Sequence, residues 1–402
     1  MRLARVLGMV LGLNVLGGSA DGYALDDDRV TLYATGALTY DSNVFRLSGA
    51  LDPKPFIGTS DRSDVIRTVG AGARVAIPVS RQQFEASANV YSVAYNQFRD
   101  LDYTGRDYGG IWHWQIGNDW NGNAGVRDSI KLAGFDNTQS RLRNLITVLE
   151  RYLNGIYQLD SQTQLEAGAS YNTARNGLES QRPNDTDEIA WTAGAKYFTP
   201  SGNSVGLKLR TARTQYPMMS PFPGAIDNGF QQTSLGPTFL WQITGNARVD
   251  AAVEYVYRQY DQVSQRNYRG FNGYLNYDWT LTGRSAVKFV LRQEVAGLQD
   301  LTTTYVLART VGVYPRWAPT ATTLVEARLD YIRRRYLGDT GIFIENNPNR
   351  EDSIKSAGLS LTYQPNRNIQ AVLSLSREQR TSNVTFADYS DSLISANVQL
   401  TF

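Results

Sequence analysis

The chain ends in a strict alternation of apolar and polar residues. From Ile394 to Phe402 every second side chain is apolar, and the residues between are serine, asparagine, glutamine and threonine. Because successive side chains of a β-strand point to opposite sides, this pattern predicts a strand with one apolar and one polar face. The same alternation recurs in segments 84–90, 249–258, 271–279 and 325–331. Strands of this kind therefore run through much of the chain.

The polar faces of these predicted strands carry charged residues well inside each strand. In a β-sandwich such charges would enter a dry core at a high cost, whereas a water-filled lumen tolerates them. The same register directs Val256 towards water and Val253 towards lipid. The charges could guide a substrate or pair across the pore to stiffen the wall. The lumen-lining candidates are Glu254, Arg258, Tyr274, Lys288, Arg292, Glu294, Glu326, Arg328 and Asp330.

Short turn signals recur about every 40 residues, the length of two strands and a longer loop. They lie near residues 80, 121–122, 160–161, 201–203, 245–246, 282–283, 319–320 and 365–366. The longer connections are 47–62, 99–106, 177–185, 218–229 and 338–351. Aromatic residues near the short turns, among them Trp241, Trp279 and Trp317, indicate a membrane-interface girdle.

This rhythm predicts an all-β fold, a transmembrane antiparallel up-and-down outer-membrane β-barrel of about 18 strands, with a range of 16 to 18. The face assignment fails between 305 and 316, because Arg309 is unexpected on either face. The alternative all-β architecture is a soluble propeller or β-solenoid, whose strands would be shorter and whose turns would lack a one-sided aromatic girdle.

The N-terminus has the features of a secretory signal peptide. Arg2 and Arg5 precede an apolar run from Val6 to Gly18, and small residues follow at Gly22 and Ala24. The apolar run is shorter than a membrane-spanning helix requires, which disfavours a membrane anchor. We therefore expect residues 1–24 to be a signal peptide and residues 25–402 to form a single barrel domain with long extracellular loops.

Composition excludes several classes of function. The chain has no cysteine, a single histidine (His113) and a formal net charge of +2, which falls to +1 without residues 1–24. Zinc, thiol and nucleic-acid chemistry are therefore disfavoured, and we assign no catalytic residue, metal or cofactor. The mean hydropathy of -0.37 also excludes a bundle of membrane helices. Asp100, Asp102 and Asp107 form an acidic segment without the spacing of a known calcium loop.

The stretch TLYATGALTYDSNVFR, residues 31–46, begins as an alternating strand and then breaks at an Asx-rich triplet that includes Asp41 and Asn43. Asp and Asn bond their own backbone and end strand pairing, so the break is expected where the first strand meets an outer loop; a carbohydrate or cation contact is the alternative. The following loop contains Pro53 and Pro55, which stiffen it, and it could fold inward and constrict the pore. At the other end, Phe402 closes the last apolar face and is a candidate assembly signal.

The sequence YDSNVFR at Tyr40–Arg46, the LDDD start of the mature chain and the terminal VQLTF resemble EpsL-type barrels of exosortase-associated exopolysaccharide loci. The resemblance implies a role in exporting an extracellular polysaccharide, with a periplasmic polysaccharide-export protein and an inner-membrane polymerase as partners. It transfers no catalytic residue to this chain.

Three functions therefore remain open from the sequence. The first is an outer-membrane conduit or accessory channel for polysaccharide export; the alternative is a general or solute-specific porin. The third is a barrel enzyme, for which His113 would be the base, or an adhesin. In each case the expected location is the outer membrane of a Gram-negative bacterium. Expected partners are outer-membrane lipid, lipopolysaccharide and the assembly machinery that reads the last strand.

Overall fold

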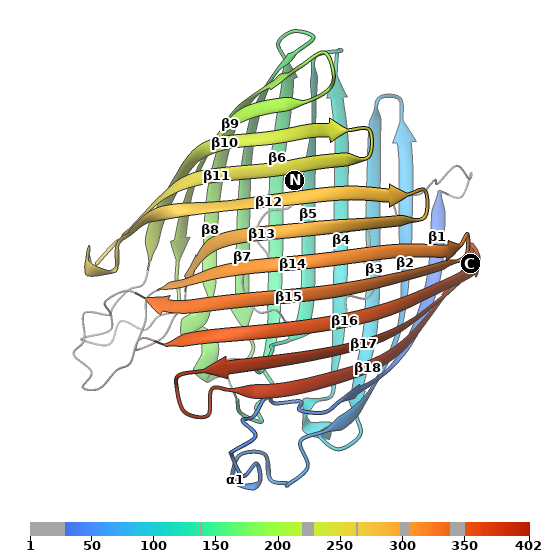
Figure 1. Cartoon of the computed structure of the whole chain (residues 1–402), viewed down its shortest axis with the longest axis vertical. Coiled ribbons are helices and arrows are strands. Elements are labelled where there is room, and N and C mark those ends of the chain that lie inside the picture. Colours follow the sequence, from blue (N-terminus) through green and yellow to red (C-terminus); the bar gives the residue numbers. More distant parts are fainter. Residues whose placement is uncertain (1–28, 137–138, 219–228, 263, 298–304, 338–349) are drawn as a thin grey trace.

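In the computed structural model the chain forms a closed antiparallel β-barrel (Figure 1). The structure describes residues 29–136, 139–218, 229–262, 264–297, 305–337 and 350–402, so the expected signal peptide lies outside the described residues. Over this part of the chain 18 strands pair in sequence order, and β1 pairs with β18 to close the wall. The expectation of an all-β, 18-stranded barrel is therefore confirmed.

The strands are β1 (Val30–Asp41), β2 (Asp64–Val79), β3 (Gln82–Tyr95), β4 (Tyr103–Ile116), β5 (Trp120–Leu132), β6 (Leu145–Gln158), β7 (Thr163–Asn176), β8 (Thr186–Phe198), β9 (Ser204–Gln215), β10 (Phe230–Thr244), β11 (Ala247–Tyr260), β12 (Tyr268–Thr282), β13 (Ser285–Gly297), β14 (Tyr305–Thr320), β15 (Thr323–Leu337), β16 (Glu351–Asn366), β17 (Ile369–Ser382) and β18 (Tyr389–Thr401). Short helices lie in the connections: α1 (Lys54–Ile57), η1 (Arg99–Leu101), η2 (Glu179–Asn184) and η3 (Ser264–Arg266). Within the described ranges, no helix has the length and apolar character needed to cross a bilayer.

The two faces of the wall follow the alternation in the sequence. On β18, Ile394, Val398 and Leu400 are exposed on the outward face, and the polar residues between them point inward. Trp241, Trp279 and Trp317 are exposed on the same outward face near short turns, as expected for an interface girdle. The short turns and the longer connections lie at opposite ends of the barrel (Figure 1).

Three predicted turns are displaced: those near 319–320 and 365–366 lie slightly later, at 321–322 and 367–368, and the one near 121–122 lies earlier. Asn121 and Gly122 lie inside β5, and the turn is made by residues 117–119, where Gly117 adopts a left-handed φ of 62°. Gly122 serves close packing instead, because a Cβ at this position would lie 2.4 Å from the Trp114 ring. An Asn-Gly pair that signals a turn locally is therefore used here to seat a tryptophan of the neighbouring strand.

The prediction of long connections also omitted one that the structure contains. Residues 133–144 link β5 to β6 at the end of the barrel that carries the other long connections. The sequence of this segment does carry a loop signal, in Gly134, Asp136 and Ser140, so the connection could have been predicted. The predicted loops 218–229 and 338–351 lie mostly outside the described residues.

The segment in which the face assignment failed is part of β14. Arg309 is exposed and sits directly opposite Arg333 of β15, on the same outward face as Val311 and Tyr331. Both arginines lie near the outer end of their strands. An outward charge is acceptable there, although it disrupts the apolar alternation of the sequence.

We predict that deleting Phe402 lowers the amount of folded, heat-modifiable protein in the outer membrane. The Phe402 amide donates to the Leu32 carbonyl at 2.8 Å, and its side chain is 72% exposed. The ring therefore contributes little to packing within the chain and is available to the assembly machinery. The matched control is Phe402→Tyr, which keeps the aromatic terminus and should assemble normally. Unchanged membrane levels of the deletion variant would contradict this role.

Candidate functional site

The inner wall of β11–β15 brings together the residues selected as lumen candidates. Strand register pairs Tyr274 with Arg292, and Lys288 with both Asp278 and Tyr314. These positions lie opposite the outward apolar residues of the same strands. The inner face of this wall also holds the remaining candidates Glu254, Arg258, Glu294, Glu326, Arg328 and Asp330.

Towards the short-turn end, this wall is open to water. Lys288 and Asp278 lie 3.7 Å apart with 40% of each side chain exposed. Arg316 and Glu326 lie 3.9 Å apart with 62% and 48% exposed. Loose, hydrated ion pairs of this kind add little stability. Their charges therefore remain available to a passing solute.

Two tyrosines of the wall donate to aspartates. The Tyr274 hydroxyl donates to Asp250 at 3.1 Å, and the Tyr314 hydroxyl donates to Asp330 at 2.5 Å. The Arg328 guanidinium also bonds Asp330 and lies 5.4 Å from the centre of the Tyr314 ring. The hydrogen bonds hold the rings against the wall.

Higher on the same wall, near the long loops, the inner face is packed. Arg258 is buried, donates to the Gln232 side chain at 2.7 and 3.0 Å and lies over the Phe230 ring. Val256 is fully buried against Tyr268 and Val295. The prediction that Val256 enters water was therefore wrong, because large side chains cover the inner face at this level.

Three connections pack together at the outer mouth. We call residues 42–63, 96–102 and 133–144 the mouth cap; residues 137–138 of the last segment lie outside the described residues. Phe45, fully buried, makes edge-on contacts with Phe98 and Phe135, each with ring centroids 4.8 Å apart. This core rests on the inner face of β3 at Val93 and Tyr95. The cap is therefore anchored on the inner face of the wall at the long-loop end, and its constriction of the pore stays a prediction.

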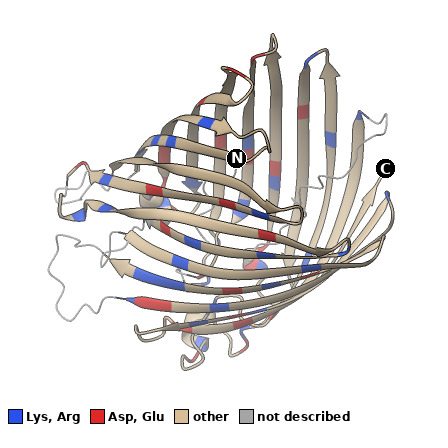
Figure 2. Ribbon diagram, turned by 45° about the horizontal axis from the view of Figure 1, so that its top comes forward, with Lys and Arg blue, Asp and Glu red and all other residues tan. Residues whose placement is uncertain are grey.

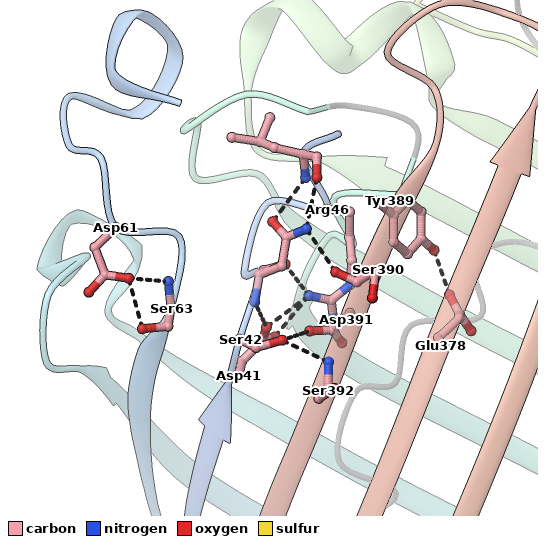
Figure 3. A network of polar contacts seen from close by, with 12 residues as sticks. Asp41, Ser42, Arg46, Asp61, Ser63, Glu378, Tyr389, Ser390, Asp391 and Ser392 are labelled. Atoms are coloured by element: carbon pink, nitrogen blue, oxygen red, sulfur yellow. Dashed lines mark hydrogen bonds and ion pairs between the residues drawn. The ribbon is translucent and has the colours of Figure 1, made fainter. Parts of the chain in front are cut away.

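The YDSNVFR segment connects strand β1 of the wall to this cap (Figure 3). Asp41 accepts the Asn43 amide at 2.8 Å, which makes the expected Asx turn. Arg46 then pairs with Asp41 at 3.0 Å and with Asp391 of β18 at 3.1 Å, all three nearly buried. Burial alone would lower the pKa of Arg46, but Asp41 and Asp391 raise it, so this arginine stays charged.

The three remaining loop candidates also have defined positions. Asn43 donates to the carbonyls of Leu47 and Ser390 at 2.8 and 3.1 Å. Pro53 is buried and precedes α1, and Pro55 lies in the first turn of that helix. The polar atoms of the YDSNVFR motif therefore form hydrogen bonds within the loop and to the start of β18.

Further contacts join the cap to the far side of the closing seam. Buried Arg380 of β17 donates to the carbonyl of Asp136 in the cap at 2.8 Å and to that of Ala387 at 2.6 Å. Next to it, Tyr389 donates to Glu378 at 2.5 Å (Figure 3). Sequence reasoning missed these residues, although extending the β18 alternation upstream would have put Tyr389 and Asp391 on the polar face.

The other residues considered from the sequence lie apart from one another. His113 contacts Asn123 and, at 3.3 Å, Glu85 on the inner wall. Asp107 pairs with Arg127 of the wall at 2.6 Å. Asp100 belongs to the cap, where a hydrogen bond from Arg141 holds its pKa below the ordinary value. Across the described ranges, no group of three potential ligands is arranged to hold a metal ion.

Comparison with known proteins agrees with this geometry. The outer membrane protein opdK of Pseudomonas aeruginosa superposes with a TM-score of 0.52 at 8% identity, over 93% of this chain and 99% of opdK. OccK2 (OpdF) of the same organism gives 0.52 at 9% identity, over 93% and 98%. Its complex with glucuronate gives 0.50 at 10% identity, over 93% and 98%. Residues 231–402 match the family model described as putative beta-barrel porin 2.

The chain folds as a closed, antiparallel 18-stranded β-barrel similar to outer-membrane porins. The superposition over 93% of the chain supports the fold of the barrel, and the low sequence identity leaves its solute open. No curated protein matches the sequence. The residues that line the lumen are therefore the basis for a proposal about its solute.

Proposed function

We propose that this porin-like barrel is a diffusion channel for small polar solutes such as sugars and sugar acids. The observation that carries the proposal is the hydrated wall of β11–β15, with its exposed ion pairs and its two tyrosine–aspartate pairs. Carboxylates and guanidinium groups bond hydroxyl and carboxylate groups, and tyrosine rings present apolar faces to sugar C–H groups.

The charges of this wall are mixed in sign. Lys288, Arg292, Arg316 and Arg328 share it with Glu254, Asp278, Glu294 and Glu326. A balanced lining supports selection by local hydrogen bonding and size over selection by net charge. The glucuronate complex of OccK2 (OpdF) is a fold-level precedent for a small sugar acid in a barrel of this type.

Polysaccharide export is the second candidate. It is favoured by the YDSNVFR resemblance, which implies an export locus with a periplasmic partner. The mouth cap argues for smaller cargo, because a polymer would have to pass beside a packed core centred on Phe45. In this proposal the outer opening limits the size of the solute.

We expect proteoliposomes containing the barrel to swell in monosaccharide and uronate solutions, and the rate to fall steeply from disaccharide to longer oligosaccharides. Replacing Tyr274 and Tyr314 by phenylalanine removes both hydrogen bonds to aspartate and should change the ratio of uronate to neutral sugar entry. Tyr363→Phe on the outward face is the matched control and should behave as the wild type.

Two results would decide against the channel. One is the absence of monosaccharide entry in vesicles that contain folded barrel. The other is loss of surface polysaccharide after gene deletion, with unchanged small-solute uptake by the cells. The second result would support the export function instead.

A further inference from the structure

The outward face of β14–β17 carries more positive charge than its carboxylates neutralise. We call Arg309, Arg333, Arg335, Lys355 and Arg377 the outer basic patch. Among the described residues on this face of the four strands, Glu351 is the one carboxylate, at 2.6 Å from Arg333 and 3.1 Å from Arg335. Figure 2 shows these basic segments on neighbouring strands with an acidic segment beside them.

On the other strands of the described barrel, three outward arginines are paired with a carboxylate, while Arg67, Arg151 and Arg269 stand singly on β2, β6 and β12. Arg106 pairs with Asp128 at 2.7 Å, and Arg213 pairs with Asp261 at 3.0 Å. Arg175 pairs with Asp187 in the same way. A cluster of five outward cations on adjacent strands therefore distinguishes β14–β17 from these single arginines.

The strand register brings like charges face to face. Arg309 and Arg333 are direct cross-strand partners, so their Cα atoms lie within about 4.5–5.5 Å of each other. Directly opposed like charges destabilise a sheet. Arg309 bonds the neutral Gln293 side chain at 2.8 Å, which leaves its charge uncompensated. An anion bound between the two guanidinium groups would remove this repulsion.

The patch borders a shallow apolar groove on the same face. The groove has a volume of about 450 Å³, and its lining includes Val311, Leu329, Tyr331 and Ala357, with Lys355 and Arg377 at one side. Such a surface offers a hydrocarbon chain a place directly beside two cations. A ligand with an anionic head and an acyl tail would contact both parts.

The height of the patch also fits the headgroup region of the outer leaflet. Lys355 lies eight residues from Tyr363 on β16, and Arg309 lies eight residues from Trp317 on β14. A tilted strand climbs about 2.3 Å per residue along the membrane normal, so the cations lie about 19 Å above the aromatic girdle. The apolar band of such barrels is about 25 Å tall, which puts extended arginine and lysine side chains near its outer edge.

We propose that the outer basic patch binds the phosphate groups of lipopolysaccharide, with an acyl chain in the adjoining groove. Guanidinium groups form bidentate, charge-assisted bonds to phosphate oxygens, and Lys355 adds a point charge. The site is on the lipid side of the wall and is independent of the solute that crosses the lumen.

The test uses purified full-length barrel and native mass spectrometry with lipopolysaccharide. The patch variant carries R309Q, R333Q, K355Q and R377Q. The control carries R67Q, R106Q, R175Q and R213Q, and therefore loses the same number of outward cations elsewhere. We expect wild type and control to retain lipopolysaccharide, and the patch variant to retain about ten-fold less, because several charge-assisted bonds are lost. Dephosphorylated lipopolysaccharide should bind the wild type as weakly as the phosphorylated lipid binds the patch variant.

Equal retention by the patch variant and the control would overturn the proposal. So would equal binding of the dephosphorylated lipid, or binding of inorganic phosphate alone with no preference for lipid. If the fourfold variant does not fold, the double variant R333Q and R377Q provides the same comparison against R106Q and R213Q.

Discussion

Arginine at Val253 is expected to destabilise the barrel by about 2–4 kcal/mol, the cost of a cation at the midplane of the lipid face. Val253 lies at the centre of β11 with 49% of its surface exposed on the outward face. Its replacement must therefore place a charge in hydrocarbon or distort the strand. The free energy of unfolding can be measured by urea titration in lipid vesicles, followed by tryptophan fluorescence.

The matched control for Val253 is Asn276→Arg on the neighbouring strand β12. Asn276 is on the inner face opposite Asp250, so an arginine there meets water and a carboxylate. We expect a change in unfolding free energy below about 0.5 kcal/mol, as for ordinary surface substitutions. Val256 does not serve as the control, because it is packed in the interior. Equal effects at Val253 and Asn276 would show that the face assignment of these strands is wrong.

The second large effect is expected at the mouth, where Arg46→Ala should open the cap and raise single-channel conductance in planar bilayers. Removing one member of a buried ion pair typically costs about 3–5 kcal/mol. Here it leaves the carboxylates of Asp41 and Asp391 next to each other without their cation. The loss falls on the loop connections, while the hydrogen-bonded wall of 18 strands stays closed.

Two further variants define this experiment. Phe45→Ala removes the ring at the centre of the cap core and should open the mouth by an independent route, with a cost of about 3–5 kcal/mol. Lys54→Ala changes an exposed residue of the same loop and should leave conductance unchanged. Wild-type conductance in both Arg46→Ala and Phe45→Ala would contradict a constricting role for the cap.

The hydrophobic pattern of the sequence was sufficient to predict the strands of the wall. It was not sufficient to predict how the loops at the outer mouth pack. The alternation around Val253 and Ile394 identifies the outward face because a strand has a period of two and lipid selects apolar side chains. The same logic failed at Arg309, where the outward face leaves the hydrocarbon region and charge becomes acceptable. It also failed at Gly122, whose environment depends on Trp114 of another strand.

The sequence by itself determined the fold class, the approximate strand number, the two faces of the clearly alternating strands and the Asx turn after β1, because these follow from nearest-neighbour geometry. Only the tertiary structure decided that Phe45, Phe98 and Phe135 meet in one core. It also decided that Arg380 reaches the loop of Asp136, 244 positions away. Closing the barrel brings β1 against β18, so segments from both ends of the chain and a middle loop share one mouth. The periodicity of one strand does not depend on how the barrel closes. It therefore does not predict contacts between residues that lie far apart in the sequence.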